Sequence, residues 1–392
     1  MSAWDAVVAE SVFWRQNAAI ASFFYHNRRE IPMREKHRVM LRPAAYAACR
    51  AAVDKAFELF PLHLTGKKVL IKPNVLRRAA PEEAVTTHPA VVRAVMERVL
   101  ESKPAALWVG DNPGVTGYGD NEACFRDSGL MEAAGGHYVN LGNRSAAVPF
   151  APAEDGRIQV SSAVLEADIV ISVPKFKTHG LTLLSGAIKN SYGILPGTLK
   201  GRLHQRAGNP DSFQRMLVEV FKLRVPDLFI MDAIVGMQGN GPACKDLRHI
   251  GLIMASDNAV AMDAVMARMV NLDPRGLRAL ALAAEQGLGS FEQDDIHIEG
   301  EFKILHDFML PHIPESGYAS PGVQQFMDRA LTVSPAVNSE LCISCGECVE
   351  ICPAAALIME GELPRVDLGK CIRCYCCQEL CPQKGIQLRP DA

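Results

Sequence analysis

Nine of the twelve cysteines lie near the C-terminus, and eight of these form two runs that share the spacing C-x-x-C-x-x-C-x-x-x-C-P at a constant offset of 29 residues. The runs are Cys342, Cys345, Cys348 and Cys352, followed by Pro353, and Cys371, Cys374, Cys377 and Cys381, followed by Pro382. Cysteine thiolates ligate iron–sulfur clusters, and two-residue gaps let three of them converge from one tight loop onto three corners of a cubane. The spacing therefore predicts two 4Fe-4S clusters.

In this spacing the fourth cysteine of each run ligates the cluster of the other run. We therefore expect one cluster to be held by Cys342, Cys345, Cys348 and Cys381, and the second by Cys371, Cys374, Cys377 and Cys352. The remaining cysteine of this region, Cys376, aligns with Glu347 of the first run and is not expected to be a ligand. Disulfides and zinc are the alternatives. Disulfides are rare in reducing compartments, and zinc sites need no interlocked, proline-ended runs.

The last 55 residues resemble the ferredoxin module that carries two 4Fe-4S clusters, and they do so through both cysteine runs and their prolines. The resemblance implies a small α+β domain, electron transfer and a redox partner protein. These residues hold five Lys or Arg and eight Asp or Glu, which accounts for the whole formal charge of -3.

Upstream of the cysteines, short apolar runs alternate with stretches of helical periodicity. Strands are expected at 68–72, 106–110, 168–173 and 228–232, and helices lie between them in the sequence pattern. Such alternation is typical of an α/β domain with a doubly wound, mostly parallel sheet. We expect this domain to span 44–304, after an N-terminal helical extension (1–43) and before a proline-containing linker (305–337) and the ferredoxin domain (338–392).

Polar residues follow the expected strands at their carboxyl ends, where ligands bind in open parallel sheets. A basic loop, 175–179, is expected to follow the buried strand 168–173. Asp232 is expected to be the last residue of the strand 228–232. We predict that Lys177 and His179 are catalytic, because imidazole is the side chain that titrates near neutral pH. The predicted substrate-binding residues are Lys72, Asn74, Asp111, Lys175, Lys189, Asn190, His204 and Asp232.

Structural roles, without a function in binding or catalysis, are alternatives for these residues. The basic loop could be a solvated loop, and the glycine-rich turn that begins at Asp111 matches no nucleotide-binding pattern. His88 could cap a helix, and Asp263 could make polar contacts in the core, although both side chains are of types that bind metals. The sequence shows no flavin, haem or nicotinamide motif, and it leaves open whether a further flavin or metal is bound.

Several motifs in order resemble the family called domain of unknown function 362, whose members often carry a ferredoxin tail. The resemblance covers about residues 65–300 and implies an iron–sulfur protein of redox function, without a settled substrate or catalytic residue. The motifs are Ile71-Lys-Pro-Asn-Val75, Thr87-His-Pro89, Gly110-Asp-Asn-Pro-Gly114, Ala167-Asp-Ile-Val-Ile-Ser-Val-Pro-Lys175, Lys177-Thr-His179, Gly186-Ala-Ile-Lys-Asn-Ser191, Met231-Asp-Ala-Ile234 and Gly239-Asn-Gly-Pro242.

Charge and N-terminal composition exclude some classes of protein. The chain before residue 338 holds 36 basic and 36 acidic residues, so it lacks the basic domain expected of a nucleic-acid binder. The N-terminus shows no basic segment followed by a long apolar run, so we expect no membrane span and a cytoplasmic protein.

The sequence favours an iron–sulfur oxidoreductase or reductase component, which relays low-potential electrons to an anionic small molecule or cofactor at the strand ends. Two alternatives remain: a non-catalytic electron-transfer partner of another redox enzyme, and a ligase or transferase with structural clusters. Whether the chain is itself an enzyme is left open at this stage.

Overall fold

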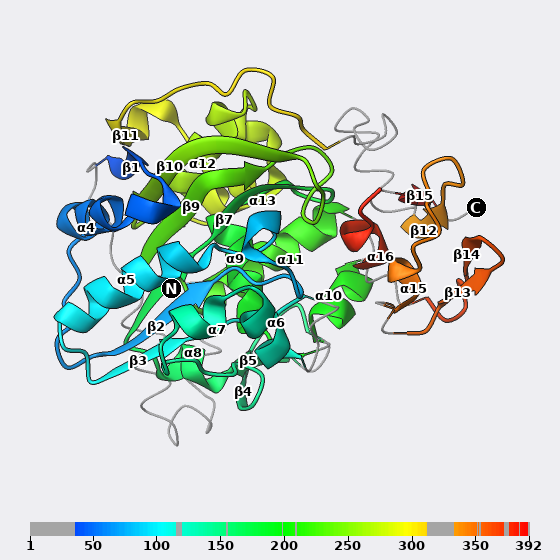
Figure 1. The fold of residues 1–392 in the computed structure, drawn as a ribbon, viewed down its shortest axis with the longest axis horizontal. Coiled ribbons are helices and arrows are strands. Elements are labelled where there is room, and N and C mark those ends of the chain that lie inside the picture. The colour runs from blue at the N-terminus through cyan, green and yellow to red at the C-terminus, as the bar shows by residue number, and fades with distance from the viewer. Residues whose placement is uncertain are drawn as a thin grey trace, which may run out of the picture. The chain divides into compact units, whose positions relative to one another are not determined.

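The computed structural model describes residues 36–114, 120–153, 156–197, 199–207, 210–311, 333–350, 352, 354–371, 376–383 and 385–390. A mixed sheet of nine strands forms the α/β domain, in the order β11-β1-β10-β9-β6-β2-β3, and β7 and β8 join it beside β9 (Figure 1). The strands are β1 (His37–Pro43), β2 (Lys68–Pro73), β3 (Ala106–Val109), β6 (Ile169–Val173), β7 (Lys175–His179), β8 (Leu183–Ser185), β9 (Leu228–Met237), β10 (Leu247–Ser256) and β11 (Ile296–Gly300).

Most neighbouring strands of this sheet are parallel, including β2 with β3 and β6, and β9 with β6 and β7. The strand β10 runs antiparallel to both of its neighbours, β1 and β9. A separate hairpin joins β4 (Ser145–Pro149) to β5 (Arg157–Ser161). The predicted α/β class with a mostly parallel sheet is confirmed.

Helices cover both faces of the sheet, because its strands are apolar on both sides (Figure 1). On one face Val53 and Val95 pack with the strand residue Ile230, and on the other Phe221 and Val265 pack with Phe229. The helices are α4 (Arg50–Leu59), α5 (Pro89–Glu101), α6 (Asn121–Asp127), α7 (Leu130–Ala133), α8 (Ser162–Glu166), α9 (Ala187–Asn190), α10 (Leu199–Ala207), α11 (Pro210–Leu223), α12 (Ala259–Met269) and α13 (Arg278–Glu285).

The first strand corrects the predicted N-terminal boundary. The segment expected to be a helical extension ends in β1, which pairs with β10 on one side and with β11 on the other. Its apolar core, Val39 to Leu41, is buried, so these residues belong to the sheet. Residues 1–35 of the predicted extension lie outside the described residues.

Two predictions near the strand ends are wrong. Residues 175–179 form a buried strand, β7, rather than a loop, and β7 continues alongside β9 after the break at Pro174. Proline has no N–H to donate to the ladder, which explains the break. The strand β9 runs on to Met237, so Asp232 lies within it and pairs in register with Lys175.

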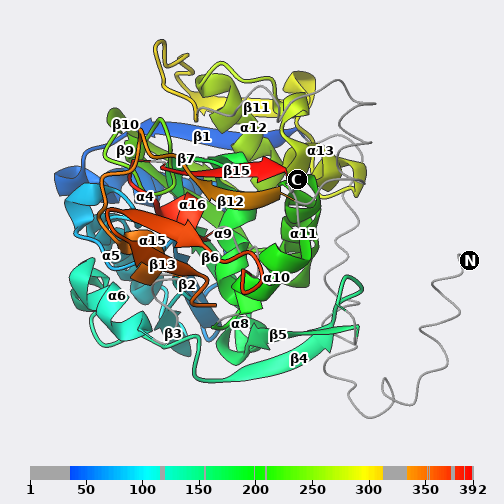
Figure 2. The same ribbon diagram turned by 90° about the vertical axis from the view of Figure 1, so that its right-hand side faces the viewer.

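The C-terminal module is built from one unit used twice. Each unit is a strand, a short helix and a second strand, and the first strand of each pairs with the second strand of the other. Figure 2 shows β12 beside β15. The elements are β12 (Val333–Val337), α15 (Glu347–Glu350) and β13 (Leu357–Glu360), then β14 (Leu363–Val366), α16 (Cys376–Leu380) and β15 (Ile386–Pro390). The pairing of β12 with β15 means that the predicted linker, 305–337, is wrong over its last five residues. Residues 312–332 of that linker are not described.

Backbone hydrogen bonds repeat at the same offset as the cysteines. Asn338 N donates to Gly385 O at 2.7 Å, and Asp367 N donates to Ala356 O at 2.7 Å. Asn338 of the first unit is equivalent to Asp367 of the second, and Ala356 is equivalent to Gly385. The two hydrogen bonds are therefore related by a local twofold axis between the units. Among the helices of the described residues, none is both long and apolar enough to cross a membrane.

The strand β1 supplies a test of the corrected boundary. Leu41→Ala should lower the free energy of unfolding by about 2–5 kcal/mol, because it leaves a cavity in the core, whereas a change at the exposed neighbour Arg42 should cost about 0.5 kcal/mol or less. Urea unfolding of Leu41→Ala and Arg42→Ala measures the difference. Equal, small effects would show that 37–43 is not an integral strand.

Candidate functional site

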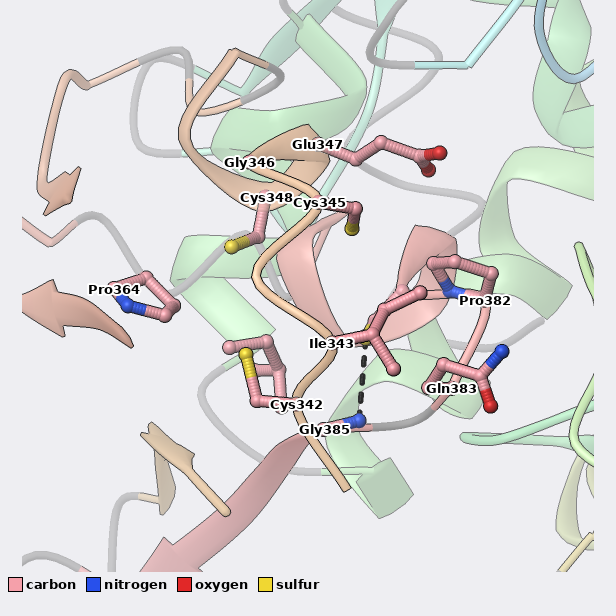
Figure 3. Close-up of a pocket in the computed structure, with 12 residues that line it drawn as sticks. Cys342, Ile343, Cys345, Gly346, Glu347, Cys348, Pro364, Pro382, Gln383 and Gly385 are labelled. Atoms are coloured by element: carbon pink, nitrogen blue, oxygen red, sulfur yellow. Dashed lines mark hydrogen bonds between the residues drawn. The ribbon is translucent and has the colours of Figure 1, made fainter. Parts of the chain in front are cut away.

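Four cysteines from the two runs surround one pocket of the C-terminal module (Figure 3). Cys342, Cys345 and Cys348 come from the loop and helix after β12, and Cys381 follows directly after α16. This is the set in which the fourth cysteine crosses from one run to the other.

The equivalent set of the second run is described in part. Cys371 and Cys352 are half-buried, and Cys377 is buried next to the buried Cys376. Cys374 lies outside the described residues.

The sulfur atoms of the two crossing cysteines accept equivalent backbone hydrogen bonds. Gly385 N donates to Cys381 Sγ at 3.2 Å (dashed in Figure 3), and Ala356 N donates to Cys352 Sγ at 3.1 Å. Backbone N–H groups aimed at sulfur stabilise negative charge there, and such bonds tune the potentials of iron–sulfur clusters. The donors therefore suit cysteines that ligate a cluster as thiolates.

Burial raises the pKa of the Cys348 thiol to about 11, and the neighbouring Cys381, Cys345 and Cys342 raise it further in that order. A buried thiol with this raised pKa needs a positive centre beside it to become a thiolate. No group of three His, Cys, Asp or Glu side chains in the described part of the chain could hold a metal ion. Four cysteines that hold a cubane would agree with the raised pKa of Cys348 and with this lack of a site for a single ion. The ligands of a cubane bind different irons, so they lie further apart than the ligands of one ion.

In the α/β domain, the carboxyl ends of β2 and β3 meet in a buried ion pair. Lys72 Nζ lies 2.6 Å from Asp111 Oδ1, and Val75 N donates to Asp111 Oδ2 at 2.8 Å. Burial lowers the pKa of Lys72, and Asp111 opposes that shift. Gly193 closes over the pair, because a Cβ there would lie 2.0 Å from Asp111 Oδ1 and 2.7 Å from Lys72 Nζ.

A second buried ion pair joins β7 to β9. Lys175 Nζ lies 2.7 Å from Asp232 Oδ2 and donates to Tyr46 Oη at 3.0 Å. The Tyr46 ring stacks on the His88 ring with centroids 3.6 Å apart, and His88 N donates to Asp232 Oδ2 at 2.9 Å. Burial lowers the pKa of Lys175, and Asp232 opposes that shift.

Two asparagines connect Lys177 to the first ion pair. Lys177 Nζ donates to Asn74 Oδ1 at 2.6 Å and to Val85 O at 2.9 Å. Asn74 Nδ2 donates to Asn190 Oδ1 at 3.2 Å, and Lys72 Nζ reaches the same oxygen at 3.4 Å. These contacts form one hydrogen-bonded network. We call it the strand-end network, and its members are Lys72, Lys177, Asn74, Asn190 and Asp111.

The remaining predicted residues lie on β7, α9 and α10. His179 is fully buried in β7, and its Nδ1 accepts a hydrogen bond from Leu181 N at 3.1 Å, which assigns the ring proton of the neutral imidazole to Nε2. Lys189 is half-buried and lines a small pocket with Asp263 and Gln214. His204 lies on α10, and its side chain is among those not described.

The helix α9 brings Asn190 into the network, and Asp263 holds that helix. Ala187 N and Ile188 N donate to the two carboxylate oxygens of Asp263 at 2.6 and 3.0 Å. Burial raises the pKa of Asp263 to about 7, and both N–H donors oppose that shift. The core polar role considered for Asp263 fits these contacts, and His88 caps α5 as considered, with Nδ1 accepting from Ala90 N.

Two residues near the network were not assigned a role from sequence. Tyr46 begins a short 3-10 helix (Tyr46–Ala48), and nothing in its local sequence signals the contact with Lys175. Lys200 donates to Asn112 O at 2.5 Å and to Pro113 O. Burial lowers the pKa of Lys200 to about 7, against the opposing effect of Asp111.

The strand ends thus present a buried polar cluster rather than a solvated basic loop, so that alternative is wrong. Lys72 and Lys175 each have a carboxylate of the chain as partner, and Lys177 binds neutral oxygens. Binding of an anion there remains a prediction.

Two family models match the chain. The model described as domain of unknown function (DUF362) matches residues 69–268, and the model described as 4Fe-4S dicluster domain matches residues 334–382. A thylakoid-associated protein of Synechocystis sp. is 33% identical over 234 residues, which cover 57% of this chain and 69% of that protein.

Similarity to solved structures is weaker. The lactate racemase apoprotein from Thermoanaerobacterium thermosaccharolyticum aligns with a TM-score of 0.40 and 12% identity, over 62% of this chain and 59% of that one. A protein from Thermotoga maritima aligns with a TM-score of 0.30 and 14% identity, over 48% of this chain and 50% of that one. The matched part spans less than two thirds of either structure, and no activity is transferred from them.

The Lys72–Asp111 pair supplies a test of the strand-end network. Lys72→Met should lower the free energy of unfolding by about 3–5 kcal/mol, because it leaves the Asp111 carboxylate buried without its counter-charge. Adding Asp111→Leu to Lys72→Met should restore most of that loss, because two apolar side chains then fill the space. Denaturant unfolding of the single and double variants measures the coupling, and strictly additive losses would contradict a buried pair.

The raised pKa of Asp263 predicts a pH dependence. Between pH 5 and 7 the folded chain keeps a proton on Asp263 that the unfolded chain has lost, so stability must fall as pH rises through this window. Between pH 5 and 7.5 the wild type should lose on the order of 3 kcal/mol relative to Asp263→Asn, which cannot titrate. Urea midpoints at both pH values measure this, and parallel profiles would refute it.

Proposed function

The chain belongs to the domain of unknown function 362 family and carries a 4Fe-4S dicluster domain, and on that premise we propose that it is an iron–sulfur redox protein. When bound, two 4Fe-4S clusters would accept and release electrons one at a time at low potential. The chain's own residues hold the clusters, tune them and bind what exchanges electrons with them.

One observation carries this proposal: the crossing of Cys381 into the pocket of Cys342, Cys345 and Cys348. We assign these four to one cluster, and Cys371, Cys374, Cys377 and Cys352 to the other. The equivalent N–H donors to Cys381 and Cys352 support one design for both sites. A zinc site or a disulfide needs neither the crossing nor the repeated donors.

We further propose that the electrons reach an anionic small molecule or cofactor at the strand ends of the α/β domain. Reduction adds negative charge, and fixed ammonium groups in a water-poor site stabilise such charge strongly. Lys177 is suited to this role because its ammonium group is buried and held by the neutral Asn74 amide oxygen and the Val85 carbonyl. His179 would donate a hydrogen bond from Nε2–H to the negative charge that develops on reduction, because its Nδ1 accepts from Leu181 N.

A second candidate function is a non-catalytic electron-transfer partner of another redox enzyme. Two ion pairs favour this candidate. Lys72 pairs with Asp111 and Lys175 pairs with Asp232, so both ammonium groups already have a counter-charge within the chain. In this case the strand-end network stabilises the fold alone. For both candidates we propose a cytoplasmic location, because thiolate-ligated clusters persist in a reducing compartment.

Neighbouring cysteines supply a matched test of the cluster assignment. Cys377→Ala should lose about four of roughly eight irons per chain, the content of one cubane, whereas Cys376→Ala should keep them all. Iron and acid-labile sulfide, measured on anaerobically purified protein, give the counts. Equal iron in both variants, or zinc in place of iron in the wild type, would overturn the assignment.

Anion binding at the strand ends separates the two candidate functions. Inorganic phosphate or citrate should raise the thermal midpoint of the wild type and of Lys68→Ala, whose residue is exposed at the amino end of β2, but not that of Lys177→Ala or His179→Ala. Each variant must keep its iron content for the comparison to count. If neither anion protects the wild type, the electron-transfer partner is the better proposal.

A further inference from the structure

The C-terminal module has an open groove of about 390 Å³ that the cluster assignment does not use. It runs between β12 and β14 and continues to the turn after β14. Two of its apolar side chains are exposed, Leu363 at 37% and Leu368 at 49%. Its lining residues are Pro335, Ala336, Val337, Glu360, Leu363, Pro364, Arg365, Val366 and Leu368.

The groove adjoins the pocket of the four cysteines. Pro364 lines both of them, and Figure 3 shows it at the edge of the cysteine pocket. Ser344, in the cysteine loop, donates a hydrogen bond to Glu362 O just before β14. In the same loop Ile343 is 60% exposed beside Cys342. A molecule seated in the groove would therefore be separated from that pocket by one side chain.

The module that carries the groove is acidic. It holds eight Asp or Glu against five Lys or Arg, whereas the rest of the chain is balanced. Glu360 and Arg365 line the groove and pair with each other at 2.5 Å, and Glu362, next to the lining residue Leu363, is exposed. An apolar groove in an acidic surface fits a contact face that is apolar at its centre and basic at its rim.

We propose that this groove docks a redox protein whose contact face is apolar and rimmed by lysine or arginine. The proposal rests on the proposed redox function and adds where and with what kind of partner electrons are exchanged. When bound, a cluster held by Cys342, Cys345, Cys348 and Cys381 would give one electron to the oxidised centre of the partner, with no bond or proton changing place. Charge attraction brings the partner in, and the leucines hold it.

The test uses the full chain with its clusters, reduced under argon, and a basic cytochrome c as the electron acceptor. Stopped-flow reduction of the ferric haem should slow as ionic strength rises. The double variant Leu363→Gln/Leu368→Gln should lower the second-order rate constant about tenfold, as loss of apolar anchors does. The matched control is Leu247→Gln, whose side chain is also 37% exposed but lies on β10, and it should match the wild type.

A small neutral quinone serves as the second acceptor, because it needs no docking groove, and its rate should be the same in all three proteins. The proposal is overturned if the double variant reduces cytochrome c as fast as the wild type. It is also overturned if quinone reduction falls equally, or if sedimentation shows two copies of the chain joined through the groove. A chain that takes up no electrons at all would instead contradict the proposed function.

Discussion

The arrangement at the strand ends depends on one constraint, which is that a charged amine placed inside a sheet must be neutralised or hydrogen-bonded there. Lys72, Lys175 and Lys177 all lie in the interior, and their partners come from distant segments: Asp111, Asp232 and Asn74. The surrounding backbone follows from these contacts. Gly193 has no side chain because the first ion pair occupies that space, and Asp263 holds α9 so that Asn190 reaches the network.

The C-terminal module meets a related constraint with sulfur. Burial and the three neighbouring cysteines raise the pKa of Cys348, and each crossing cysteine has a backbone N–H aimed at its sulfur. Repetition of one strand–loop–helix–strand unit provides this geometry twice. The protein thus combines a 4Fe-4S dicluster domain with a domain whose buried charges are stabilised by its own residues, and the two proposed functions differ in whether the latter also binds a ligand.

The sequence predicted the parts of the structure that have local signals. Cysteine spacing indicated the crossing of Cys381, and the apolar run at 168–173 indicated β6. The strand β7 was missed because its sequence, KFKTH, has the charge of a surface loop, and its lysines are buried only because Asp232 and Asn74 reach them from distant segments. The strand β1 was missed because its apolar core is three residues long, between Arg38 and Arg42, and its partners lie more than two hundred residues away.

The central claim is that the chain accepts and releases electrons through two clusters. A reductive titration of anaerobic protein, followed by low-temperature electron paramagnetic resonance, tests it most directly. The account predicts uptake of about two electrons per chain with signals of reduced 4Fe-4S clusters, because each cubane takes one. Full iron content with no electron uptake at potentials accessible to dithionite would contradict the account and leave the clusters a structural role.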